Sequence, residues 1–217
     1  MKQHPILLVG AGGHCKALID VIEQGDLFKI EGLFDHPNSK ITDLLGYPIV
    51  GDDSSLSRFK QKFDHAFPAI GFLNKQVNRA NLYFKLKGLG YVIPNIISNR
   101  SYISKFCKLG DGNAVLHDST LNVDSCIGSN NIIQTKCLLD HDVSVGDHNY
   151  ISTGTLINGN VCIGDLNLIG SNVTINQGCK IGSNIIIGSG AVVVKDISAS
   201  GTYVGVPAKK IKWEELQ

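Results

Sequence analysis

Long runs of one kind of residue are missing from this chain of 217 residues. No long run of charges of one sign occurs and the formal net charge is +1, so we do not expect nucleic acid or an anionic membrane as a partner. The apolar run "PILLVG" near the start is much shorter than the roughly 18 residues of a membrane-spanning helix, and it lacks the form of a secretory signal peptide. We therefore expect a globular protein that does not insert into a membrane.

Cysteine patterns that hold metals are missing as well. The six cysteines show no CxxC spacing, and no Cys/His arrangement has the spacing of zinc ligands, so we expect no metal site. Scattered cysteines without a secretory signal are typical of the reducing cytosol. We therefore expect free thiols and a cytoplasmic location.

Glycine, in contrast, is abundant, with 24 residues against six prolines. From residue 97 onward an aliphatic residue recurs at every sixth position, seventeen times in succession. The positions are Ile97, Ile103, Leu109, Val115, Leu121, Ile127, Ile133, Leu139, Val145, Ile151, Ile157, Ile163, Ile169, Ile175, Ile181, Ile187 and Val193. A period of six is neither helical nor a simple strand alternation; it is typical of a parallel β-helix, in which each hexad supplies one short strand and one turn.

A longer period of eighteen residues lies within the hexads. The segments "LGDGN", "IGSNN", "VGDHN", "IGDLN" and "IGSNI" begin at residues 109, 127, 145, 163 and 181. Three hexads therefore make one coil, and we expect Asn113, Asn131, Asn149 and Asn167 to stack as a ladder. We expect glycine at these corners because it tolerates a positive φ, and we expect the other turn residues to point outward.

The first 94 residues have a different pattern, in which apolar segments alternate with amphipathic ones. Strands are predicted at 5–10, 30–35 and 65–71, and helices at 11–25, 54–62 and 74–90; the apolar segment 47–51 lies between the second strand and the second helix. Alternating strands and helices predict a small parallel α/β, Rossmann-like domain over residues 1–94. The β-helix would then follow over residues 95–205, with a C-terminal tail over 206–217.

The turn "GAGGHC" after the first strand partly matches a dinucleotide fingerprint. Gly10 and Gly12 are in place and Asp35 ends the second strand, but the third glycine position holds Cys15. Backbone N–H groups at the start of a helix favour an anion such as a phosphate. The alternative is a tight strand–helix turn that binds no ligand.

The segment "LLDHDVSVGDHNYIS", residues 138–152, contains two histidines in turns. A turn histidine is more often solvated than catalytic, but Asp140 and Asp142 flank His141 and could orient its ring. His148 lies on the glycine-bearing turn, where we expect a solvated side chain.

Three motifs together, "GAGGHCK", "DHDVSVGD" and "GVPAKK", make the chain resemble the sialic-acid O-acetyltransferase-like group of hexapeptide acyltransferases. Bacterial enzymes that N-acetylate nucleotide-linked amino sugars belong to the same group. The resemblance implies a left-handed β-helix, a homotrimer, and acetyl-CoA as co-substrate.

The resemblance also implies roles for individual residues. His141 would be the general base and Asp142 its partner. The residues implied for acetyl-CoA are Tyr150, Gly159, Gly170, Ser171, Gly188 and Ser189. Tyr150 stands where the family often has a second histidine, so its role is an open question. The residues implied for the sugar nucleotide are Gly12, Gly13, His14, Asp35 and His36.

The function predicted is acetyl-CoA-dependent N-acetylation of a nucleotide-linked amino sugar, for surface glycan biosynthesis. Two alternatives remain open: O-acetylation of a sialic-acid-like sugar with the same base, and a non-catalytic β-helix scaffold. The sequence does not identify the sugar, the nucleotide or the pathway.

Overall fold

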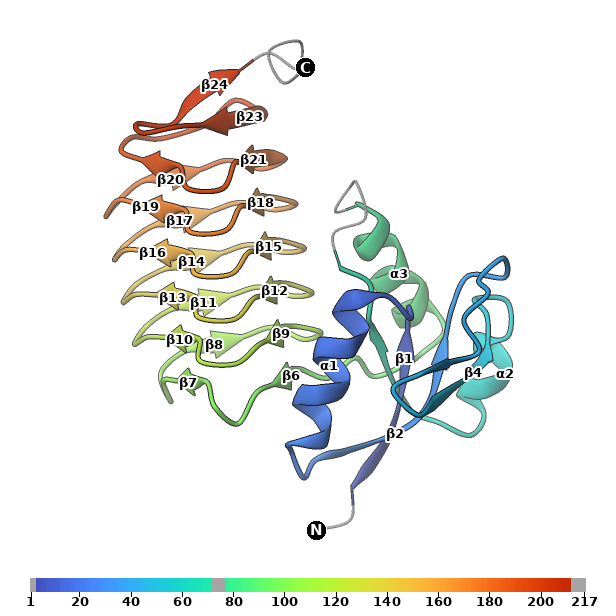
Figure 1. Cartoon of the computed structure of the whole chain (residues 1–217). Helices are drawn as coiled ribbons and strands as arrows, with labels where there is room; N and C mark the ends of the chain where they lie inside the picture. The colour runs from blue at the N-terminus through green and yellow to red at the C-terminus, as the bar shows by residue number, and fades with distance from the viewer. Residues whose placement is uncertain (1–2, 72–76, 212–217) are drawn as a thin grey trace. The chain divides into compact units, whose positions relative to one another are not determined.

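A computed structural model describes residues 3–71 and 77–211 of the chain. The chain divides into two compact units, Met1–Asn99 and Arg100–Gln217, a few residues after the boundary expected at residue 94. Each unit has a fold of its own (Figure 1). Among the described residues, no helix has the length and apolar character needed to cross a bilayer, and no group of three potential metal ligands is found.

The first unit is a five-stranded sheet in the order β3-β4-β2-β1-β5 with three helices. The strands are β1 (His4–Val9), β2 (Phe28–Phe34), β3 (Asp43–Leu44), β4 (Tyr47–Gly51) and β5 (His65–Pro68). The helices are α1 (Gly13–Glu23), α2 (Leu56–Lys60) and α3 (Val77–Gly88), and β6 (Ile96–Ile97) follows them. Residues 74–76 of the helix predicted over 74–90 lie outside the described residues.

The expected parallel α/β arrangement is confirmed: β1 pairs in parallel with β2 and β5, and β2 pairs in parallel with β4. The chain crosses from one side of β1 to the other between β4 and β5. Two strands of this sheet were not predicted, β4 and the short antiparallel strand β3. The hairpin turn between them uses Leu45 and Gly46, both with positive φ, and leucine is not one of the residues that normally mark such a turn.

The second unit is a three-sided parallel β-helix, stacked from green to red in Figure 1. The first face consists of β7 (Tyr102–Ile103), β10 (Thr120–Leu121), β13 (Leu138–Leu139), β16 (Leu156–Ile157), β19 (Thr174–Ile175) and β22 (Val192–Val193). The second consists of β8 (Lys108–Leu109), β11 (Cys126–Ile127), β14 (Ser144–Val145), β17 (Cys162–Ile163) and β20 (Lys180–Ile181). The third contains β9 (Ala114–Val115), β12 (Ile132–Ile133), β15 (Tyr150–Ile151), β18 (Leu168–Ile169), β21 (Ile185–Ile187), β23 (Gly201–Val204) and β24 (Lys209–Ile211).

Neighbouring coils pair with a register of eighteen residues, for example Leu138 with Leu156. This is the expected fold class of a left-handed β-helix following a small α/β domain. Within the tail expected over residues 206–217, β24 pairs antiparallel with β23. Residues 212–217 lie outside the described residues.

The aliphatic series forms the core of the β-helix. Every member from Val115 to Val193 is buried, because the second residue of each strand points inward. Ile103 and Leu109 are only partly buried. Ile97 is 39% exposed and lies in the first unit, so the inward column does not begin there as predicted.

The asparagine ladder is confirmed. The backbone N–H of Asn131 donates to the side-chain oxygen of Asn113 at 2.8 Å, and the same bond joins Asn149 to Asn131 and Asn167 to Asn149. These four side chains are fully buried, contrary to the expectation that turn residues point outward. Each side-chain oxygen accepts a backbone N–H of the next coil, which would otherwise be buried without a hydrogen-bond acceptor.

The reason predicted for the corner glycines is wrong. Gly128 and Gly146 do not have positive φ; instead, a Cβ at Gly146 would lie 3.0 Å from the backbone of Gly164 on the next coil. These glycines permit close stacking of coils. The left-handed backbone positions are occupied by other residues, including Asp142 (φ 60) and His148 (φ 61).

Candidate active site

Three edges join the faces of the β-helix. The histidine edge is formed by turns that follow first-face strands, including residues 140–143 and 158–161. The glycine edge is formed by turns that follow second-face strands, including residues 146–149. The serine edge is formed by turns that follow third-face strands, including residues 152–155, 170–173 and 188–191.

His141 and Asp142 form a pair on the histidine edge. The His141 Nδ1 atom lies 2.8 Å from the Asp142 carboxylate oxygen Oδ2. Because a carboxylate only accepts hydrogen bonds, Nδ1–H donates, and in the neutral ring the lone pair is left on Nε2. About half of each side chain is exposed, 48% for His141 and 57% for Asp142. The pair therefore presents a basic nitrogen at the surface of the turn.

The charges around His141 favour its protonated form. The hydrogen bond to Asp142, followed by the nearby charge of Asp140, raises the pKa of His141 above its ordinary value. Its nitrogen is therefore a better proton acceptor than an isolated imidazole, once the pH is high enough for the ring to be neutral.

Gly159 lies under the ring of His141, one coil further along the same edge. A Cβ at Gly159 would be 2.6 Å from Cε1 and 2.7 Å from Nε2 of His141. A side chain at this position would displace the imidazole. The structure thus brings Gly159, which the resemblance implied for acetyl-CoA, together with the predicted base.

His148 is not the solvated residue that we expected. It is half-buried on the glycine edge, and its Nδ1 lies 2.8 Å from the side-chain nitrogen of Asn130 on the preceding coil. The register of eighteen residues produces this contact. His148 and His141 consequently lie on different edges.

The other residues implied for acetyl-CoA lie at the serine edge. The Ser152 and Ser171 hydroxyls are 2.8 Å apart, and the Ser171 N–H donates to the Ser189 hydroxyl at 3.2 Å. Gly170 allows close stacking, since a Cβ there would lie 2.6 Å from the Ser189 nitrogen. Gly188 begins the turn of Ser189, and a Cβ there would lie 2.7 Å from a Val204 methyl group. Ser152, Ser171 and Ser189 therefore form a continuous polar strip along this edge.

Tyr150 lies on the third face, next to the serine edge that carries this strip. It points outward from β15 on the third face, and its hydroxyl accepts a hydrogen bond from the Gln134 side chain at 2.8 Å. The third face lies opposite the histidine edge. Within one chain, therefore, the structure does not bring Tyr150, Ser171 or Ser189 to His141.

The first unit contains a cavity of about 320 Å³ at the carboxyl ends of its parallel strands. It is lined by Val9, Gly10, Asp35, His36, Asp53, Ile70, Asn78, Asn81, Leu82 and Lys85. The cavity lies where β2 and β5 diverge on either side of β1, which is the usual ligand site of open α/β sheets. Asp35 and His36 are therefore at this cavity, as predicted.

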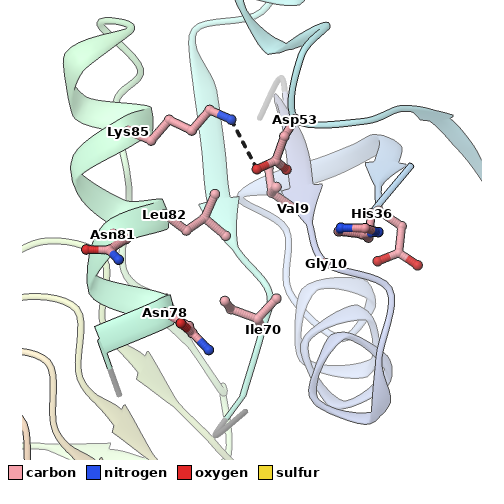
Figure 2. A pocket seen from close by; sticks show the side chains of 10 residues that line it. Val9, Gly10, His36, Asp53, Ile70, Asn78, Asn81, Leu82 and Lys85 are labelled. Carbon is pink, nitrogen blue, oxygen red and sulfur yellow. Dashed lines mark hydrogen bonds and ion pairs between the residues drawn. The ribbon is translucent and has the colours of Figure 1, made fainter. Parts of the chain in front are cut away.

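One wall of this cavity comes from α3 and was missed by the sequence analysis. Asn78, Asn81 and Lys85 line the cavity from α3, and Lys85 extends toward the strands and pairs with Asp53 at 3.1 Å (Figure 2). Their spacing places them on one side of a helix, a signal that the sequence contained. What the sequence could not show is that this side faces the strands.

Gly12, Gly13 and His14 do not line the cavity, although Gly10 does. Gly12 is the N-cap of α1 and Gly13 its first residue, and no side chain caps this helix start. Its first backbone N–H groups are therefore suited to an anion. Burial, together with the Arg79 charge, lowers the pKa of His14 to about 3, so its imidazole is neutral, and neither ring nitrogen has a hydrogen-bond partner within the described residues.

Comparison with known families and structures gives consistent matches. Residues 5–86 match the PglD N-terminal domain. PerB from Caulobacter crescentus, solved with CoA and GDP-perosamine, is 30% identical with a TM-score of 0.89, and the match covers 96% of this chain and 97% of PerB. Two further structures of that perosamine N-acetyltransferase carry a histidine replaced by asparagine or by alanine.

Two other solved structures have the same fold. WeeI from Acinetobacter baumannii is 26% identical with a TM-score of 0.83, over 96% of this chain and 100% of WeeI. The acetyltransferase domain of PglB from Neisseria gonorrhoeae, solved with acetyl coenzyme A, is 24% identical with a TM-score of 0.89, over 97% of this chain and 100% of the domain. No curated protein sequence gives a significant match.

Proposed function

Because the chain belongs to the nucleotide-amino-sugar N-acetyltransferases of the hexapeptide family, we propose that it transfers the acetyl group of acetyl-CoA to the amine of a nucleotide-linked sugar. PerB, which is similar over nearly its whole length, is a GDP-perosamine N-acetyltransferase. We place the reaction in the cytoplasm, where acetyl-CoA and nucleotide sugars are available, as a step in the synthesis of a surface glycan.

The observation that carries this proposal is the His141–Asp142 pair over Gly159. The neutral amine of the sugar attacks the thioester carbonyl, and the C–N bond forms while the Nε2 atom of His141 accepts the amine proton. The tetrahedral intermediate then collapses, the C–S bond breaks, and the coenzyme leaves as a thiolate that is protonated from His141 or water. Asp142 holds Nδ1–H and stabilises the imidazolium that forms.

The cavity of the first unit is the part that we assign to the nucleotide. Asp35, Asn78 and Asn81 offer hydrogen-bonding groups of the kinds that recognise a base or ribose, and Lys85 offers a cation. The uncapped start of α1, at Gly12, Gly13 and the neutral His14, is assigned to the phosphates. We thus assign nucleotide binding to the first unit and acetyl transfer to the β-helix.

A homotrimer would complete the acetyl-CoA site. The histidine and serine edges flank the first face, whose outward residues include Tyr102 and Leu156, exposed by 59% and 43%. If three copies turn this apolar face toward a threefold axis, the histidine edge of one meets the serine edge of the next. The His141 and Gly159 positions would then face Ser171 and Ser189 of the neighbour across a groove, and closed cyclic symmetry is a common form of assembly.

The proposal is tested by incubating the purified protein with acetyl-CoA and a panel of UDP-, GDP- and dTDP-linked amino sugars, with release of free thiol as the readout. We expect thiol release with at least one of them and an N-acetyl product by mass spectrometry. Acetylation of a free sialic acid at a hydroxyl, without reaction of any nucleotide sugar, would replace N-acetylation by O-acetylation. No binding of acetyl-CoA in calorimetry would indicate the scaffold.

The assignment of the phosphates has its own test. We expect Gly13→Val to raise the KM for the nucleotide sugar, because its side chain would crowd the backbone N–H groups of the helix start. The KM for acetyl-CoA should not change. Equal increases of both KM values would contradict the assignment.

A further inference from the structure

The Asp140 side chain bonds both to the catalytic turn and to the coil that precedes it. Its Oδ1 atom accepts the backbone N–H of His141 at 2.8 Å and the side-chain N–H of Asn122 at 3.1 Å. Asn122 lies one coil earlier, and its own side-chain oxygen accepts the N–H of Val123 at 3.0 Å. One carboxylate oxygen therefore links the histidine-bearing turn to the preceding coil.

We propose that Asp140 is a positioning residue for acetyl transfer: anchored by Asn122, its carboxylate fixes the backbone amide of His141 and so directs the imidazole over Gly159. The inference rests on the proposed role of His141 as the base. It adds a second point of control, since Asp142 holds the ring and Asp140 holds the backbone from which the ring projects.

The turn needs such an anchor because of its backbone. Asp142 has a φ of 60, a left-handed conformation that residues other than glycine adopt at a cost. The backbone of the turn is bonded to both adjacent coils: Asp142 N–H donates to the Val123 carbonyl at 3.1 Å, and the His141 carbonyl accepts the Asn160 N–H at 3.0 Å. The backbone N–H of His141, which lies in the same turn, does not bond to either of these two described coils and instead donates to the Asp140 carboxylate.

Hydrogen bonding and charge can be separated at this residue. The charged side chains on the elements packed around His141 are Asp140, Asp142 and Asp124, which occupies the position of Asp142 one coil earlier; Gly159 and Asn160 of the next coil are neutral. Of these, Asp142 and then Asp140 raise the pKa of His141. Asparagine at 140 would keep an acceptor oxygen and lose the charge, whereas alanine would lose both.

The experiment compares Asp140→Asn, Asp140→Ala and Asn122→Ala, with Asp124→Asn as the matched control. For each, kcat is measured against pH, and the His141 imidazole is titrated by NMR in the protein without substrate, its signal assigned with His141→Ala. We expect Asp140→Ala to lower the high-pH plateau of kcat by about 10²-fold, the loss typical of a displaced catalytic group, with an unchanged KM for acetyl-CoA. Asp140→Asn should recover most of the plateau.

The pH dependence distinguishes positioning from packing. Both Asp140 variants should lower the pKa of His141 and move the acidic fall in kcat to lower pH, because a charge that favours the imidazolium is gone. Asn122→Ala should lower the plateau without moving that fall, since Asn122 is neutral. Asp124→Asn should leave the plateau unchanged.

A wild-type plateau and an unchanged His141 titration in Asp140→Ala would overturn the inference. If Asp140→Ala does not fold, the Asp140→Asn and Asn122→Ala profiles decide the question by the same criteria. Failure of the proposed function would give a different result. The wild-type protein would acetylate no substrate, while Asp140→Asn would still shift the NMR titration of His141.

Discussion

His141 and His148 lie seven residues apart in turns of similar form, but their partners differ. His141 meets a carboxylate at the surface, whereas His148 meets the neutral side chain of Asn130. We expect His141→Ala to reduce kcat by roughly 10²–10⁴-fold, the usual contribution of a general base. The exposed ring contributes little to packing, so the melting temperature should remain near that of the wild type.

His148→Ala is the control for this prediction. It removes an imidazole from the same stretch of chain but from another edge, so kcat should fall by much less than in His141→Ala. Similar losses of kcat in the two variants would contradict the assignment of His141 as the base.

Gly159 should act through His141 alone. In Gly159→Ala the new methyl group would overlap the imidazole, and displacement of the ring by about 1 Å can cost on the order of 10²-fold in rate. The measurement is a double-mutant cycle of kcat for Gly159→Ala and His141→Ala. We expect strong coupling, with little further loss when the alanine at 159 is added to His141→Ala. Additive losses would mean that Gly159 serves the coenzyme independently of the base.

At the scale of the elements, the asparagine ladder stabilises successive coils. Asn149→Ala would leave the buried N–H of Asn167 without its acceptor, at a cost of about 1–3 kcal/mol in the free energy of unfolding. Denaturant unfolding of this variant measures the loss. Asn176, an exposed turn asparagine, supplies the control, and Asn176→Ala should change the free energy of unfolding by less than about 0.5 kcal/mol. Equal losses would indicate that the ladder adds nothing beyond ordinary turn asparagines.

The elements that could be predicted from the sequence are those governed by period. The hexads determine which aliphatic side chains point inward, and the register of eighteen places Asn131 on Asn113 and Gly159 beside His141. The same register pairs His148 with Asn130, so this contact also follows from the spacing of the sequence. The α3 wall of the cavity could not be predicted, because it depends on how that helix packs against the sheet.

The whole molecule should be a trimer whose activity depends on assembly. Leu156→Arg places a charge on the apolar first face, and we expect it to yield monomers in light scattering and to abolish acetyl transfer, since the two edges would no longer meet. Ser144→Arg, at the corresponding outward position of the second face, is the matched control and should remain trimeric and active. A wild-type protein that is monomeric at micromolar concentration would contradict the prediction.

The eighteen-residue register also fixes the distances between residues along each edge of the β-helix. Each coil advances the chain by ~4.8 Å, so distances along an edge come in whole steps. Removing one complete coil between Ser152 and Ser171 would shorten the strip by one step and leave every later residue on its edge. Removing a single hexad would turn all later residues by one third of a revolution and carry Ser189 to a different edge. We therefore expect the β-helix to tolerate insertions and deletions in multiples of eighteen residues. The length of edge available to a bound ligand then changes by whole coils.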